Sequence, residues 1–180
     1  VNGVVLITTK TGKANVRQIM FDAQIGVGTV AKRYETLNPY EFGTLYNTYR
    51  KETFSPEQLS AFQNGTAGTD WLDEIFQNGI TQDYKLTLSG GSDKIQYIIS
   101  GNYVGQEGVV KENTNKRYQA RANITSQLTD WLHLTADVNA SHNVKRSADF
   151  SAAKGNIVNI AMNYAPVLGI MNEDGTYTRD

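Results

Sequence analysis

Residues 116–141 read KRYQARANITSQLTDWLHLTADVNAS, and this stretch decides the fold class. Apolar and polar side chains alternate along it, on either side of a short turn at Thr129 and Asp130. A period of two residues is typical of β-strands, because successive side chains point to opposite faces of a sheet. The stretch therefore predicts a hairpin of two strands, residues 116–127 and 131–141, with one apolar and one polar face.

Residues 17–30, 82–89 and 95–104 alternate in the same way, and Gly90-Gly91-Ser92-Asp93 is a tight hairpin signal. Because short turns favour pairing between successive strands, we expect all these strands to be consecutive antiparallel neighbours. A shorter apolar strand is predicted over Val4–Thr9. The side chains expected on one apolar face are Ile19, Ile25, Leu86, Ile99, Ala122, Leu134 and Val138.

Residues 31–81 have a different character, because helix-start signals replace the alternation. Asn38-Pro39-Tyr40-Glu41 and Ser55-Pro56-Glu57-Gln58 each place a capping residue before a proline, with Glu or Gln at the third helical position. A third short helix is predicted from Thr69 or Asp70 to before Gly79. The segment is therefore predicted to be an ordered helical insertion between strands. Another helix is predicted around residues 156–164.

The composition narrows the function classes. The 180 residues include 17 Lys and Arg against 18 Asp and Glu, so the net charge is −1 and no basic block suggests nucleic-acid binding. The chain has no cysteine, which removes disulfides and thiolate chemistry. No apolar run approaches the ~18 residues of a membrane-spanning helix, but the strands of a membrane β-barrel alternate and remain possible. We interpret the sequence as a fragment of a longer protein.

Two features favour a transmembrane β-barrel over a soluble β-sandwich. The apolar faces are rich in alanine, while the polar faces carry Asn, Gln, Thr and Ser, as a water-filled lumen would. The connections are long at 31–81, short at 90–94, medium at 105–115, short at 127–131 and long from 142 onward. This order fits outer-membrane barrels, which have long external loops and short periplasmic turns. Tyr84, Tyr103 and Tyr118 would then lie near the external strand ends and Trp131 near the periplasmic end, like two aromatic girdles.

No catalytic constellation is present in the sequence, so we do not expect an enzyme, a cofactor or a metal site. His133 alternates with polar residues on a strand, and His142 has no evident ligand partner. Asp70, Asp73 and Glu74 suit the first turn of a helix, where acidic groups interact favourably with the helix dipole.

Trp71, Tyr46 and Tyr49 are the candidate contact residues, because they lie in the helical insertion. Aromatic rings there could stack on sugars or contact a partner protein. More often, such residues pack short helices against one another.

Three segments resemble the SusC/RagA-type TonB-linked outer-membrane transporters. NGVVLITTKTGK at residues 2–13 is similar to the end of that family's plug domain. TDWLDEIFQNGITQDYKLTLS at residues 69–89, followed by Gly90-Gly91, is similar to a pattern early in the family's barrel. Residues 165–177, with Asn-Glu-Asp-Gly at 172–175, resemble a later loop, although Ala165-Pro166 stands where two prolines are expected.

The resemblance implies an all-β fold, part of a transmembrane antiparallel barrel of about 22 strands around a plug. Residues 1–13 would end the plug domain, and residues 14–180 would form the first part of the barrel, with the helical insertion in an external loop. It implies TonB-dependent import of oligosaccharides or peptides across the bacterial outer membrane, in contact with outer-membrane lipid. The implied partners are the TonB complex and a SusD-type surface lipoprotein. The alternative is a soluble carbohydrate-binding or adhesion β-sandwich.

Overall fold

The computed structural model describes residues 3–4, 14–147, 156–172 and 174–178. The chain divides into two compact units. The first contains Val1–Gly28, Gly79–Glu107 and Thr114–Arg146, and the second contains Thr29–Asn78, Gly108–Asn113 and Ser147–Asp180. The strand predicted over Val4–Thr9 lies outside the described residues, apart from Val4 itself.

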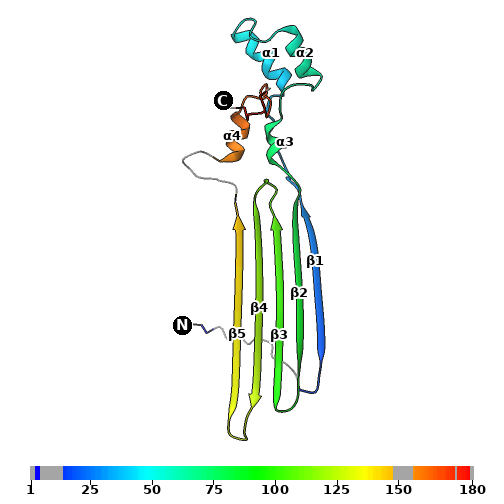
Figure 1. The fold of residues 1–180 in the computed structure, drawn as a ribbon, viewed down its shortest axis with the longest axis vertical. Coiled ribbons are helices and arrows are strands. Elements are labelled where there is room, and N and C mark those ends of the chain that lie inside the picture. The colour runs from blue at the N-terminus through cyan, green and yellow to red at the C-terminus, as the bar shows by residue number, and fades with distance from the viewer. Residues whose placement is uncertain (1–2, 5–13, 148–155, 173, 179–180) are drawn as a thin grey trace. The chain divides into compact units, whose positions relative to one another are not determined.

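The first unit is a single antiparallel sheet whose strands follow one another in chain order (Figure 1). This confirms the predicted succession of hairpins. Its strands are β1 (Gln18–Gly28), β2 (Gly79–Gly91), β3 (Ile95–Glu107), β4 (Thr114–Gln127) and β5 (His133–Arg146).

Several strands are longer than the alternation predicted, because backbone pairing continues past the last informative side chain. β2 begins at Gly79, where the register pairs it with Gly28, so the preceding connection ends at Asn78 instead of residue 81. β3 continues to Glu107 and β5 to Arg146. At the opposite end of the sheet the turns are short, and Ser92 N–H donates to the Ile95 carbonyl at 2.6 Å.

The register gives the sheet its two faces. Ile19 pairs with Leu88, Leu88 with Ile99, Ile99 with Ala122, and Ala122 with Val138. Directly paired residues point to the same side of a sheet, so these apolar side chains form one row across it. Among the described residues of the first unit, no helix packs on this sheet. The side chains of the row range from half-buried, as Leu88 and Ala122 are, to exposed; Val138, for example, is 61% exposed.

The second unit contains the predicted helices: α1 (Pro39–Tyr49), α2 (Pro56–Gln63), α3 (Trp71–Ile75) and α4 (Ile157–Asn163). Each begins at a side chain that caps its first turn. The Asn38 side-chain oxygen accepts from Glu41 N–H at 2.8 Å while Glu41 accepts from Asn38 N–H at 3.0 Å, a reciprocal capping box. Ser55 and Gln58 repeat this arrangement on α2. No helix among the described residues is long and apolar enough to cross a membrane.

The helices α1 and α2 pack through a small aromatic cluster. Gly43 of α1 is buried, and a Cβ there would stand 3.0 Å from Leu59 of α2, so glycine permits the close approach. Phe42 stacks on Tyr46, Tyr46 meets Phe54 edge-on, and Phe54 meets Phe62 at 5.6 Å between ring centroids. Phe62 is one of the most buried apolar side chains of the described residues, at 9% exposed.

Candidate functional site

An aromatic row crosses the apolar face of the sheet. Tyr84, Tyr103 and Tyr118 are cross-strand partners, and Tyr118 pairs with His142. Their ring centroids are 6.3, 5.1 and 6.4 Å apart in that order. His142 is therefore not at a strand end, as its sequence position suggested, but inside β5 and stacked on a tyrosine. The row lies toward the strand ends that lead into the long connections.

The same face carries no charged side chain over most of its height. On β5, the residues that share this face from Leu134 to Val144 include no Asp, Glu, Lys or Arg. Ten residue steps along a strand correspond to ~34 Å, or ~26 Å along the membrane normal at a tilt of ~40°. That height matches the ~25 Å apolar band of an outer-membrane barrel.

The opposite face of the sheet is polar and concave. An Arg121 guanidinium N–H donates to Asp137 at 2.9 Å, and the Asn123 side-chain amide donates to the same carboxylate at 3.3 Å. On the neighbouring strands the Asn102 amide donates to Asp83 at 2.7 Å. A trough of about 1020 Å³ runs over this face. Its polar lining residues are Asp22, Gln24, Asp83, Lys85, Ser100, Asn102, Gln119, Arg121 and Asn139.

In the second unit, Trp71 joins two segments that are far apart in the sequence. Its indole N–H donates to the Ala165 carbonyl at 3.0 Å, and its ring meets the Tyr164 ring edge-on at 4.8 Å. Beside it, Thr69 donates through its backbone to Pro166 and through its hydroxyl to Leu168, both at 2.8 Å. These contacts give Trp71 a packing role in the described structure, which is one of the two roles that the sequence left open.

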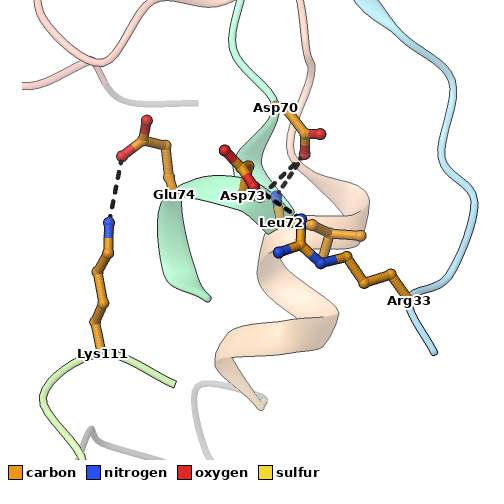
Figure 2. A network of polar contacts seen from close by, with 6 residues as sticks. All are labelled: Arg33, Asp70, Leu72, Asp73, Glu74 and Lys111. Carbon is orange, nitrogen blue, oxygen red and sulfur yellow. Dashed lines mark hydrogen bonds and ion pairs between the residues drawn. The ribbon is translucent and has the colours of Figure 1, made fainter. Parts of the chain in front are cut away.

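Ion pairs join α3 to two further segments of the same unit (Figure 2). Arg33 donates to Asp73 at 2.8 Å, and its guanidinium lies 5.6 Å from the centre of the Phe76 ring. Lys111 Nζ lies 3.8 Å from Glu74, while Lys111 N–H donates to the Ile75 carbonyl at 2.9 Å. Asp73 and Glu74 therefore have local structural partners.

The other two candidate contact residues lie on α1 and differ in exposure. Tyr46 belongs to the aromatic cluster and is 38% exposed. Tyr49, near the helix end, is 82% exposed, and no aromatic or hydrogen-bond partner is found for it within the described residues. Of the three candidates, Tyr49 is the one whose ring is most available to a ligand or a partner.

A hairpin turn closes the described part of the C-terminal segment. Met171 and Tyr177 form a bridge, and Asp174 accepts from the Thr176 hydroxyl at 2.6 Å and from its backbone N–H at 2.9 Å. The hydroxyl hydrogen bond, with help from the backbone one, holds the pKa of Asp174 below its usual value.

In the described part of the chain, no three His, Cys, Asp or Glu side chains come together as metal ligands would.

Comparison with known proteins identifies the family. No protein-family model matches the chain. TonB-dependent receptor P3 of Formosa agariphila is 31% identical over 182 residues, which cover 98% of this chain and 17% of the receptor. TonB-dependent receptor SusC of Bacteroides thetaiotaomicron is 31% identical over 157 residues, covering 86% of this chain and 15% of that receptor. The chain belongs to the SusC/RagA-type TonB-dependent receptors. The solved RagAB peptide transporter has the same fold over 94% of the chain and 23% of its own, with a TM-score of 0.65 and 20% identity.

As part of such a receptor, the sheet is a section of a bacterial outer-membrane β-barrel, with short helices inserted between β1 and β2. This excludes the soluble β-sandwich that the sequence had left open. The relatives compared are receptors and transporters, not enzymes. The chain spans 17% and 15% of the length of these two relatives.

The sequence missed the partners that organise the second unit of this receptor. Tyr164 and the Ala165 carbonyl hold Trp71, and the carbonyls of Pro166 and Leu168 hold Thr69. Arg33 and Lys111 hold α3 from other segments. These pairs join residues far apart in the chain, and no periodicity reports such contacts. The one available signal was compositional: a Trp and two acids within four residues of a short helix.

Proposed function

We propose that this chain forms part of the barrel wall of a TonB-dependent importer that carries oligosaccharides or peptides across the outer membrane. The observation that carries the proposal is the two-faced sheet. One face has an uncharged apolar band of membrane height, and the other is a polar trough suited to a water-filled lumen. The relatives named TonB-dependent receptors support the energy source, and the RagAB transporter supports peptides as one substrate class.

We assign residues 1–13 to the end of a plug domain and residues 14–180 to the first strands of the barrel. The family resemblance of residues 2–13 supports the plug assignment. The long connection after β1, the shorter connection at 108–113 after β3 and the segment after β5 would be external, since these strands run in the same direction. The short β2–β3 and β4–β5 turns would then be periplasmic.

The proposed partners are a SusD-type lipoprotein at the external mouth and the TonB complex, reached through a part of the receptor beyond these residues. Tyr49 is the favoured contact on the external side because its ring is exposed. Trp71 would act indirectly, by holding the segment around Ala165, and Tyr46 by packing α1 on α2.

The test is uptake by cells that carry or lack the full-length receptor. Labelled oligosaccharides and labelled peptides should be offered separately, with and without a protonophore that removes the energy supply to TonB. We expect uptake of one class that requires both the receptor and the proton gradient. Receptor-independent uptake of both classes, or receptor-dependent uptake that ignores the protonophore, would contradict the proposal. A Tyr49→Ala receptor, compared with Tyr40→Ala on the same helix, then tests the contact residue.

A further inference from the structure

A pocket of about 340 Å³ lies within the second unit, where three segments of the chain meet. The segments are the approach to α1 with its first turn, the start of α3, and the end of α4 with the residues that follow it. Ligand pockets in proteins occupy ~300–1,000 Å³, so this pocket has the size of a site for a small ligand.

Long-range contacts hold the three segments around the pocket. Gly68 has φ +87°, and a Cβ there would stand 2.6 Å from the Pro39 side chain and 2.8 Å from the Pro166 carbonyl oxygen. Thr69 N–H donates to the same Pro166 carbonyl at 2.8 Å, and the indole of Trp71 is held by its own hydrogen bond to the third segment. The walls of the pocket are therefore fixed by packing and hydrogen bonds.

Polar atoms without partners line this pocket. One carboxylate oxygen of Asp70 caps α3 by accepting from two backbone N–H groups at 3.0 and 3.1 Å (Figure 2). Asn38 caps α1 through its side-chain oxygen, and Asn163 donates its amide to a backbone carbonyl of α4 at 2.7 Å. Within the described residues, no hydrogen bond is found for the second Asp70 oxygen, the Asn38 amide N–H groups or the Asn163 side-chain oxygen.

These atoms lie beside an apolar wall. The apolar lining residues are Leu37, Pro39, Phe42, Trp71, Met162 and Tyr164. The free atoms of Asp70 and Asn163 are acceptors, and the free amide of Asn38 is a donor. The pocket therefore combines aromatic and aliphatic surface with hydrogen-bonding groups of both kinds.

The charges of the lining discriminate between ligand classes. Among the described residues that line the pocket, none is Lys or Arg, and the Arg33 cation of this unit is paired with Asp73 at 2.8 Å. The carboxylate of a peptide terminus or of an acidic side chain would find no counter-charge in the pocket. A neutral sugar ring has an apolar C–H face, and its hydroxyl groups both donate and accept hydrogen bonds, so its chemistry matches the lining.

We propose that this pocket binds one neutral sugar unit of an oligosaccharide. A sugar hydroxyl donates to the second oxygen of Asp70, and the C–H face of the ring lies against the apolar wall. The inference rests on the proposed importer function and names oligosaccharides as its substrate class. Trp71 keeps its supporting role, because its indole N–H is already bound to the Ala165 carbonyl.

Two variants and a matched control test the pocket in the full-length receptor, reconstituted in lipid nanodiscs. Asp70→Asn keeps the oxygen that caps α3 and replaces only the second acceptor oxygen by an NH₂ group. Ala161→Leu puts a larger side chain into the pocket from α4, and leucine is a good helix former. Asp73→Asn is the control, because it removes the same charge from the same helix at a residue that does not line the pocket.

Binding should be screened on an array of neutral and acidic oligosaccharides. The affinity for the neutral glycan that binds best should then be measured by calorimetry, with tetraalanine as the peptide probe. Asp70→Asn should weaken glycan binding roughly tenfold or more, because a hydrogen bond to a charged group is lost. Ala161→Leu should also weaken it, and Asp73→Asn should bind like the parent. Binding of no neutral glycan, an unchanged affinity in Asp70→Asn, an equal loss in Asp73→Asn, or tighter binding of tetraalanine would overturn the proposal.

Uptake by the same receptors separates this proposal from the importer function. If Asp70→Asn leaves glycan affinity unchanged while uptake requires the receptor and the proton gradient, only the sugar site is wrong. If glycan binding depends on Asp70 but the receptor supports no such uptake, the importer function is wrong and the binding site remains.

Discussion

Arginine placed at Val138 should destabilise the membrane-embedded barrel strongly. Val138 pairs with Ala122 on the apolar face, four residues from Leu134 and six from Val144, so it lies near the middle of the uncharged band. An arginine facing lipid at the bilayer midplane costs ~2–4 kcal/mol, which lowers the folding equilibrium constant roughly 30- to 900-fold. Near the interfaces the cost falls to ~0–1 kcal/mol.

Because the cost of arginine depends on its depth in the membrane, a second position on the same strand serves as an internal comparison. Leu134 shares the face of Val138 but lies one residue from the start of β5, so Leu134→Arg should cost little, although the sequence alone made it an equally good probe. Asn139→Arg is the control for the opposite face, because Asn139 lines the polar trough. The assay is reversible urea unfolding of the full-length receptor in vesicles. A cost for Asn139→Arg equal to that for Val138→Arg, or no cost at Val138, would refute the assignment of the faces.

Three further outcomes are expected in the helical unit, each read by hydrogen exchange in the full-length receptor. Trp71→Phe should lower the free energy of local opening of residues 164–168 by about 1 kcal/mol, because the indole hydrogen bond is lost. Unchanged protection of these amides would contradict this. Gly68→Ala should loosen the unit, because Gly68 has φ +87° and a Cβ there would stand 2.6 Å from a neighbouring side chain, whereas Gly175→Ala has similar strain but open space and should do less. The lowered pKa of Asp174 makes its turn most stable above the usual carboxyl pKa of ~3.9, with stability lost as pH falls through the lowered pKa, so Asp174→Asn should abolish this pH dependence.

Local signals in the sequence were sufficient to predict which helices and strands form and in what order they follow one another. Alternation identified every strand of the sheet, and Asn38, Ser55 and Asp70 marked the helix starts where the structure has them. Both signals depend on residues close together in the chain. They failed at strand ends such as Gly79, because a glycine pairs through its backbone and has no side chain to alternate.

The candidate contact residues could be located from the sequence but not assigned a role. Trp71 and Tyr49 are both aromatic residues in the same insertion, and nothing local distinguishes them. The long-range contact with Tyr164 shows that the Trp71 ring is packed, whereas the Tyr49 ring is 82% exposed. Their roles in ligand or partner binding stay predictions.

Cysteine scanning of β5 tests most directly whether the sheet stands between lipid and a water-filled lumen. This chain contains no cysteine, so single cysteines can be placed at successive positions from 134 to 144 in the full-length receptor, with any cysteine elsewhere replaced. Each variant is treated in native outer membranes with a small water-soluble maleimide, which reports exposure of the cysteine to water. A lipid-soluble spin-label reagent reports exposure of the same cysteine to lipid. We predict strict alternation: aqueous labelling at 135, 137, 139, 141 and 143, and lipid exposure at 136, 138 and 140. Equal aqueous labelling at all positions, or the inverse pattern, would contradict the central claim.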